Sequence, residues 1–418
     1  MKYVVLNVGN IFGAGFGNNG LGSGEVFGNM LTNQLESVIY GLVFVLLTLV
    51  IVMGGVSSGI EKFCSIGMPC LFFMLVIVII RACTLGGNDF AVAVLQPDGS
   101  TVEQLIHSSS LDGLKYMFQP GYVTGTGYYV PATAEVAGQV VSAINGVPVV
   151  KFINEIPNFI SILSTAGGQM FFSLSLGMGI MITYGSYLDK KQNIEKNALV
   201  IVICDTLIAL MAGLAVMPAR FSLDATGAIG GPKLLFITMQ NVFNSMGTVG
   251  YVFGIIFYLL VILAAVSSSI SLLEVIVAHF VDKARDAGKG DKRKSYSAIA
   301  AVAAGLLCVL VCMDGLGSNG MAPCDILKIG AKGWSDCWLD FLDMVSEGVL
   351  MPLGALLMSI CIGYELKPQF VDEECCLEGN AFKSKTFFNI CIKSITPILM
   401  VLVLLGQLDS FFSLGLFS

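Results

Sequence analysis

The chain has 418 residues, of which 55% are hydrophobic and only 12% are charged, and its formal net charge is −7. A soluble globular domain carries about 25% charged residues, so this chain has too few polar side chains to face water on all sides. The acidic balance also argues against nucleic acid as a partner.

Eight apolar blocks follow one another along the chain. A helix of about 20 apolar residues crosses a hydrocarbon core of about 30 Å, whereas the strands of a membrane barrel alternate apolar and polar residues. The sequence therefore predicts an all-α polytopic membrane protein with about eight transmembrane helices. The predicted spans are 38–53, 68–85, 160–184, 198–217, 252–280, 298–313, 345–362 and 387–405.

The positions of lysine and arginine predict the orientation of these spans. Alternate loops carry most of the basic residues, including the run 282–294, and loops enriched in basic residues face the cytoplasm. The segments 84–159, 218–248 and 314–337 are therefore expected outside. We interpret the basic run as a solvated cytoplasmic loop rather than a site for lipid headgroups.

The third block, 160–184, contains a weak point for a helix. Ser173, Ser175, Gly177 and Gly179 fall within seven positions. One interpretation is unwound backbone that lines a cavity, with half-helix ends facing a bound ion or substrate. The other is ordinary tight helix packing through small residues.

The next two blocks carry polar groups that are costly in lipid. Asp205 lies deep in the fourth block, where a charge costs roughly 2.5–3.5 kcal/mol on insertion scales, and this favours an ion contact. Ser267, Ser268 and Ser269 in the fifth block are candidate oxygen ligands for sodium. The alternative is that these serines bond back to carbonyls one turn earlier. Glu274, further along, is a second intramembrane acid.

At these residues the sequence resembles the neurotransmitter:sodium symporter family, particularly its bacterial amino-acid transporters. The resemblance covers about 38 to 405 and implies the inverted-repeat fold of the bacterial leucine transporter. It also implies sodium-coupled symport of amino acids or similar small solutes across the cell membrane by alternating access, with sodium as the coupling ion and no other cofactor. The matching stretches are 59–62, 66–69, 171–187, 231–238, 267–274, 340–343 and 350–354.

The resemblance assigns roles to individual residues. The first sodium site takes Ser173 and Asp205, and the second takes Ala264, Ser267 and Ser268. The substrate pocket takes Phe172, Ser175, Met178, Ser269 and Leu272. The outer gate takes Asp343 with Gln169 as its neighbour, and the cytoplasmic gate takes Tyr187 and Asp282.

The resemblance also predicts how the chain divides. Residues 1–37 are expected to be a remnant of the family's third helix with an outer loop. Residues 38–405 are expected to hold helices four to eleven, with a long outer loop at 84–159, and residues 406–418 a C-terminal tail. The family's first two helices are not matched, so we expect an open groove beside Ser173–Gly179 and no accumulation of substrate by this chain alone.

An alternative interpretation is a non-transporting remnant or split-gene half that acts at most as an assembly partner. An enzyme is not predicted, because no Ser/His/Asp set or metal cluster falls at one membrane depth. Gln240 stands where the family often has proline, and Glu347 is an acid without a predicted role. Cys324 and Cys337 both lie on the outer side, where they either form a disulfide or remain free thiols.

Overall fold

The computed structural model describes residues 1–415 except for a set of short gaps, and within that range the chain forms two compact units. Unit 1 contains residues 1–29, 65–157 and 207–263, and unit 2 contains residues 30–64, 158–206 and 264–418. Residues 59 and 60 of the family-like stretch 59–62 lie outside the described residues. The gaps are 14, 19, 55–60, 119–127, 137–138, 145, 154–157, 225–230, 289–291, 330–332 and 413.

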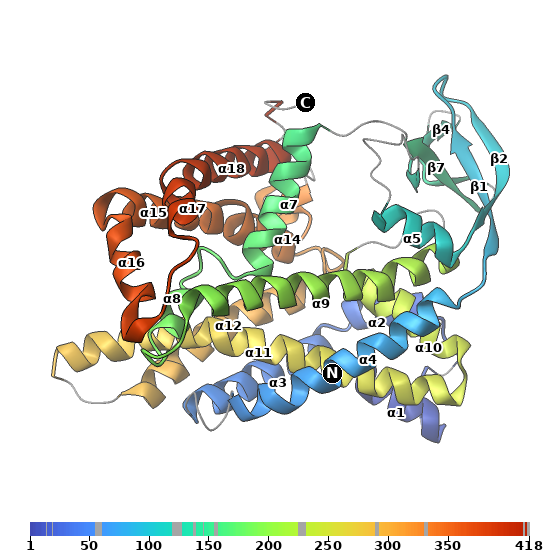
Figure 1. Ribbon diagram of the computed structural model, residues 1–418. Coiled ribbons are helices and arrows are strands. Elements are labelled where there is room, and N and C mark those ends of the chain that lie inside the picture. The colour runs from blue at the N-terminus through green and yellow to red at the C-terminus, as the bar shows by residue number, and fades with distance from the viewer. Residues whose placement is uncertain are drawn as a thin grey trace. The chain divides into compact units, whose positions relative to one another are not determined.

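Helices account for most of the described chain (Figure 1). The α-helices are α1 (Lys2–Phe12), α2 (Ser23–Thr32), α3 (Gln34–Met53), α4 (Glu61–Cys83), α5 (Ser110–Phe118), α7 (Phe159–Ser173), α8 (Ile180–Gly185), α9 (Ile194–Leu223), α10 (Met239–Ser245), α11 (Thr248–Asp286), α12 (Arg293–Asp314), α13 (Pro323–Leu327), α14 (Trp338–Asp343), α15 (Met351–Ile360), α16 (Pro368–Cys375), α17 (Lys385–Ile390) and α18 (Thr396–Phe412). The short 3-10 and π segments are η2 (Leu234–Thr238), η3 (Gly333–Ser335), η4 (Met344–Leu350), η5 (Cys361–Glu365), η6 (Leu377–Gly379) and η7 (Cys391–Ile395).

Six helical segments in the described part of the chain are long and apolar enough to cross a membrane. The predicted span 68–85 corresponds to a shorter apolar helix, Gly67–Cys83, and the span 160–184 is divided between α7 and α8. α18 continues to Phe412, so the first part of the predicted tail 406–418 is helical. The six segments are Gln34–Met53, Ile194–Leu223, Thr248–Asp286, Arg293–Asp314, Trp338–Glu365 and Lys385–Phe412.

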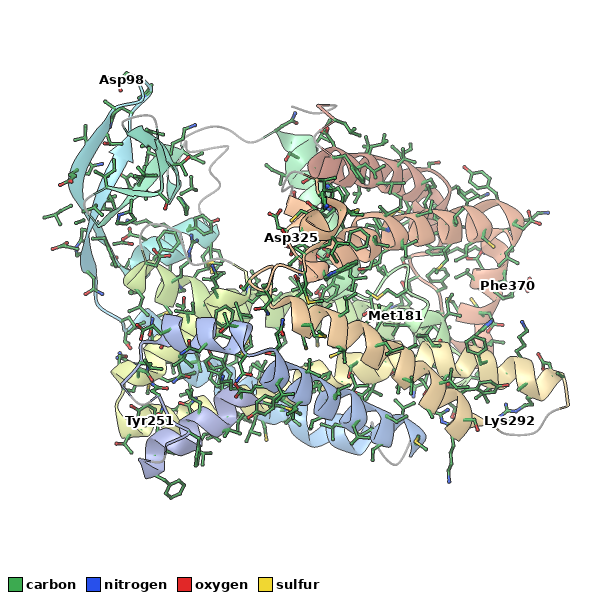
Figure 2. All side chains as sticks on the ribbon, turned by 180° about the vertical axis from the view of Figure 1, so that it is seen from behind. Asp98, Met181, Tyr251, Lys292, Asp325 and Phe370 are labelled. Carbon is green, nitrogen blue, oxygen red and sulfur yellow. The ribbon has the colours of Figure 1, made fainter. Side chains whose placement is uncertain are left out.

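The segment 84–159, which is predicted to lie outside, contains among its described residues a β-sheet of unit 1 that the sequence analysis did not predict (Figure 1). The strand order is β2-β1-β7-β3, with β6 beside β7; β1 and β2 form an antiparallel hairpin with Asp98 at its tip, as Figure 2 shows. Val92 and Val150 are fully buried in one cluster of side chains and give the sheet its own apolar core. The strands are β1 (Asn88–Leu95), β2 (Thr101–Ser108), β3 (Tyr128–Pro131), β4 (Ala134–Val136), β5 (Gln139–Val141), β6 (Ala143–Ile144) and β7 (Val147–Ile153).

Unit 1 also contains a buried amide pair between α1 and α10. The Asn7 side-chain amide donates to Gln240 Oε1 at 3.0 Å, and the Gln240 amide donates back to Asn7 Oδ1 at 3.1 Å. Gln240 also donates to Asn244 at 2.9 Å. Buried polar groups are stable when they are bonded in this way, which accounts for a glutamine where the family often has proline.

Unit 2 is held together by helices that approach closely at small residues. Gly41 of α3 faces Cys308 and Cys312 of α12, and a Cβ at position 41 would lie 2.7 Å from the Cys308 sulfur. Gly167 of α7 faces Val403 of α18 in the same way, at 2.7 Å. Membrane helices lack a hydrophobic driving force against lipid and associate through such close packing. Two pairs of helices in unit 2, α3 with α12 and α7 with α18, are therefore in close contact.

Candidate functional site

The helix begun by α7 is broken at the predicted weak point. α7 ends at Ser173 and α8 begins at Ile180. Between them the backbone turns through left-handed conformations, with φ of 54° at Ser175, 75° at Gly177 and 79° at Gly179. The unwound interpretation is therefore confirmed, and such backbone at membrane depth is tolerated where protein or a cavity surrounds it.

Close packing holds the break in place as well. A Cβ at Gly177 would overlap the Met351 carbonyl oxygen, and a Cβ at Gly354 would lie 2.7 Å from the Gly177 carbonyl oxygen. Phe171, just before the break, is buried against Met351. The small residues thus serve both of the interpretations that the sequence left open: they permit the turn and let α15 approach it.

The two residues predicted for the first sodium site are in direct contact. The Ser173 hydroxyl lies 2.9 Å from Asp205 Oδ1 and 2.8 Å from Asp205 Oδ2, and donates its proton to the carboxylate. Ser173 stands at the end of α7, and Asp205 lies within α9, one of the most apolar helices. The arrangement places three oxygen atoms together at the break in the helix.

The serines of α11 bond back to their own helix. The Ser267 hydroxyl donates to the Ala264 carbonyl at 2.8 Å, and the Ser268 hydroxyl approaches the same carbonyl at 3.4 Å. The back-bonding alternative is therefore the one seen here. It also gathers the oxygens of Ala264, Ser267 and Ser268 within one turn of helix.

A cavity of about 550 Å³ lies where the sequence predicted an open groove. Four of the five predicted substrate residues line it, together with Gln169, the predicted neighbour of the outer gate, and serines of α7 and α11. Ser269 is the exception, because it faces Thr48 of α3 at 2.7 Å and lines another cavity. The lining residues are Gln169, Phe172, Ser173, Ser175, Met178, Ile180, Met181, Tyr184, Ser267, Ser268, Ser271 and Leu272.

Two polar residues of this cavity were missed by the sequence analysis. Tyr184 of α8 and Ser271 of α11 share a hydrogen bond of 2.7 Å, and Ser271 also bonds back to the Ser267 carbonyl at 3.0 Å. Their polar atoms join the two helices across the cavity wall. The sequence signal was present, since Ser271 lies one helical turn after Ser267 and therefore on the same face.

The predicted cytoplasmic gate residues are in different surroundings. Tyr187 donates to Glu274 at 2.9 Å, and Glu274 is also bonded by Arg293, whose guanidinium donates to the Val52 carbonyl at 3.2 Å. Glu274 is only 1% exposed. Because it is buried, Arg293 rather than water balances its charge. Asp282, by contrast, is solvent-exposed and lies 3.8 Å from Arg285.

Asp343, the predicted outer-gate acid, lies at the end of α14, and Glu347 follows four positions later in η4. Glu347, which had no predicted role, is thus a direct neighbour of the proposed gate. Cys324 and Cys337 are both free thiols, and the Cys337 sulfur accepts from the Asp340 amide instead.

Comparison with known proteins decides the family. The model of the sodium:neurotransmitter symporter family matches residues 160–417, a range that contains every residue assigned above to a sodium site, the substrate pocket or a gate. The chain belongs to this family. The resemblance drawn from the sequence is confirmed. The prediction of a multi-pass membrane protein is confirmed as well.

Individual relatives agree with this assignment. An uncharacterised sodium-dependent transporter of Bacillus subtilis, YhdH, is 30% identical over 92% of this chain and 69% of its own length. A sodium-dependent transporter of Haemophilus influenzae is 27% identical over 89% of this chain and 66% of its own length. The crystal structure of MhsT in complex with L-phenylalanine has a TM-score of 0.71 and 25% identity over 97% of this chain and 77% of MhsT.

This chain therefore spans about two thirds of the length of these two curated relatives. Both relatives are named as sodium-dependent transporters, and the fold of this chain matches that of MhsT. Sodium dependence and transport, rather than catalysis, are the properties associated with the family.

Proposed function

We propose that this chain forms the sodium-binding and substrate-binding core of a sodium-coupled amino-acid symporter. The observation that carries the proposal is the cavity of about 550 Å³ at the break between α7 and α8. It brings residues from α7, α8 and α11 to one place, and Ser173 on its wall bonds Asp205 of α9. Broken helices at membrane depth are where transporters of this architecture bind their cargo.

The oxygens at the break suit sodium. The Asp205 carboxylate supplies negative charge, and the Ser173 hydroxyl can direct its lone pairs to a cation while it donates its hydrogen to the carboxylate. The Ala264 carbonyl with the Ser267 and Ser268 hydroxyls is the proposed second set. Hard cations prefer such oxygen ligands.

The rest of the cavity suits a small amino acid with an apolar side chain. Phe172, Met178 and Leu272 provide apolar wall, and the unwound backbone beside Ser175 offers amide and carbonyl groups to the charged ends of the substrate. Methionine adapts its shape to its neighbours, so the pocket is expected to accept side chains of differing size. L-phenylalanine, bound in the MhsT crystal structure, is the first substrate to test.

Binding to the purified chain in lipid nanodiscs is the direct test of the site. Radiolabelled L-phenylalanine should bind in sodium and not in potassium at equal ionic strength. Asp205→Asn and Ser173→Ala should each weaken sodium-dependent binding, whereas the matched surface changes Asp189→Asn and Ser186→Ala should leave it unchanged. Equal binding in sodium and potassium would contradict the proposed sodium sites.

Uptake into proteoliposomes with an inward sodium gradient tests transport itself. Sodium-driven accumulation would support a complete symport cycle in this chain. Sodium-dependent binding without accumulation would favour the assembly-partner alternative.

A further inference from the structure

Two adjoining hollows lie on the face of unit 2 formed by α3, α11 and α12. One is an apolar cavity of about 690 Å³ and the other a basic pocket of about 570 Å³. Tyr296 and Ile299 of α12 line both. Leu272 links the apolar cavity to the proposed substrate cavity, whose wall it also forms. A passage that runs from basic to apolar fits a molecule with an anionic head and a hydrocarbon tail.

The apolar cavity exists because α12 presents short side chains to it. Large side chains of α3 and α11 form the opposite walls, including Phe44, Ile276 and Phe280. Apart from Tyr296, the polar side chains that line this cavity are Thr48 and Ser269. Their hydroxyl groups share a hydrogen bond of 2.7 Å, so neither requires a polar ligand. The short side chains are Ala300, Ala301, Ala303 and Ala304.

The basic pocket lies at the start of α12, where Figure 2 labels Lys292. Lys292, Arg293 and Lys294 are consecutive there, and the first turn of the helix has no acidic residue and no side-chain cap. Cations are unfavourable at a helix N-terminus, which carries partial positive charge. An anion at this position would balance both the positive charge of the lysines and the partial positive charge at the start of the helix.

The inner and outer cations of this pocket have different partners. Arg293 points to the buried Glu274 and to the Val52 carbonyl, so its charge is compensated within the protein. Lys292 and Lys294 are exposed, and neither forms a salt bridge with the described residues. Two lysine charges are therefore available to a ligand at the mouth of the apolar cavity.

We propose that this face binds an anionic phospholipid of the cytoplasmic leaflet. Its phosphate lies between Lys292 and Lys294, and one acyl chain runs into the apolar cavity. Tyr296 stands at the junction, stacked on Phe280 with ring centroids 5.8 Å apart, as tyrosines do at the membrane interface. Basic pockets between helices on the cytoplasmic side are suited to such headgroups. The run 282–294 then has more than the role of a solvated loop, because its last residues adjoin a cavity for hydrocarbon.

Native mass spectrometry of the delipidated full chain tests the headgroup contacts. Phosphatidylglycerol should bind more tightly than phosphatidylcholine with the same acyl chains. Lys292→Gln with Lys294→Gln should weaken phosphatidylglycerol binding about thirtyfold, the effect expected for two lysines beside an anionic headgroup. The double change Lys190→Gln with Lys191→Gln removes the same charge from another cytoplasmic loop and should leave binding unchanged. Equal affinity for the two lipids, or equal effects of the two double variants, would overturn the proposal.

A second series tests the acyl chain. Ala303→Trp should fill the apolar cavity and weaken phosphatidylglycerol binding, whereas Ala303→Ser should not, with the melting temperature of each variant confirming that it folds. Glycerol 3-phosphate, which has the headgroup phosphate but no chain, should compete only weakly. Competition as strong as that of the lipid would show a site for free anions instead. A dimer that forms on delipidation and excludes lipid would show that a second copy of the chain covers this face.

Discussion

Ser173 at the end of α7 donates its hydroxyl proton to both carboxylate oxygens of Asp205 on α9, at 2.9 and 2.8 Å. The two residues are 32 positions apart, and the break in the α7–α8 helix is what leaves the serine at a helix end. A carboxylate in an apolar helix is costly without a partner. The hydrogen bond meets part of that cost, and a sodium ion would meet the rest.

Asp205→Asn should make sodium binding depend on chloride. The asparagine keeps the shape and the contact with Ser173 but removes the negative charge that attracts the cation. With gluconate as the only anion, we expect sodium affinity to fall about tenfold, and chloride to restore much of the loss. The measurement is sodium-dependent L-phenylalanine binding in the two salts, with Asp189→Asn as the control. Normal binding by the Asp205→Asn variant in gluconate would show that Asp205 does not have this role.

Gly177→Ala should destabilise unit 2. Position 177 has φ of 75°, and a Cβ there would overlap the Met351 carbonyl oxygen. Left-handed backbone alone costs a residue with a Cβ about 1–3 kcal/mol, and the overlap adds to this. The melting temperature of the detergent-solubilised protein should fall clearly. Gly185→Ala is the matched control, since a Cβ there meets nothing within 4 Å.

Removal of the Glu274 carboxylate should cost more than removal of the Tyr187 hydroxyl. Glu274→Ala leaves the Arg293 charge without its buried partner, which costs about 3–5 kcal/mol. Tyr187→Phe loses a single hydrogen bond, for which about 1–2 kcal/mol is expected. Thermal melting ranks the two variants. A double change, Glu274→Met with Arg293→Met, should be more stable than Glu274→Ala, and the opposite order would contradict the buried pair.

Cys375 and Cys376 should react with maleimide at very different rates. Burial raises the pKa of the Cys375 thiol above its usual value, and Cys376 is exposed. The thiolate is the reacting form, so a raised pKa leaves less of it at pH 7 and slows Cys375. Its rate should rise about tenfold per pH unit below its pKa. Peptide mass spectrometry after timed labelling checks this, with Cys376→Ser as the variant that isolates Cys375. Equal rates at pH 7 would contradict the burial.

The sequence by itself determined the membrane class, the family and most of the residues around the broken helix. These signals are local: apolar runs of spanning length, Asp205 in the middle of one of them, and two serines and two glycines between Ser173 and Gly179. Each is costly in lipid or weak in a helix. The energetic cost of each such residue can therefore be recognised from the sequence, without knowledge of the residues that contact it in the folded protein.

Only the tertiary structure decided which partners meet these residues. The bond between Tyr184 and Ser271, the amide pair of Asn7 and Gln240, and the joining of the basic pocket to the apolar cavity at Tyr296 each depend on helices that are distant in sequence. The sheet of segment 84–159 also depends on long-range pairing, because β1 pairs in parallel with β7. Hydrophobic periodicity reports which face of one element is apolar, but it carries no information on the element that will cover that face.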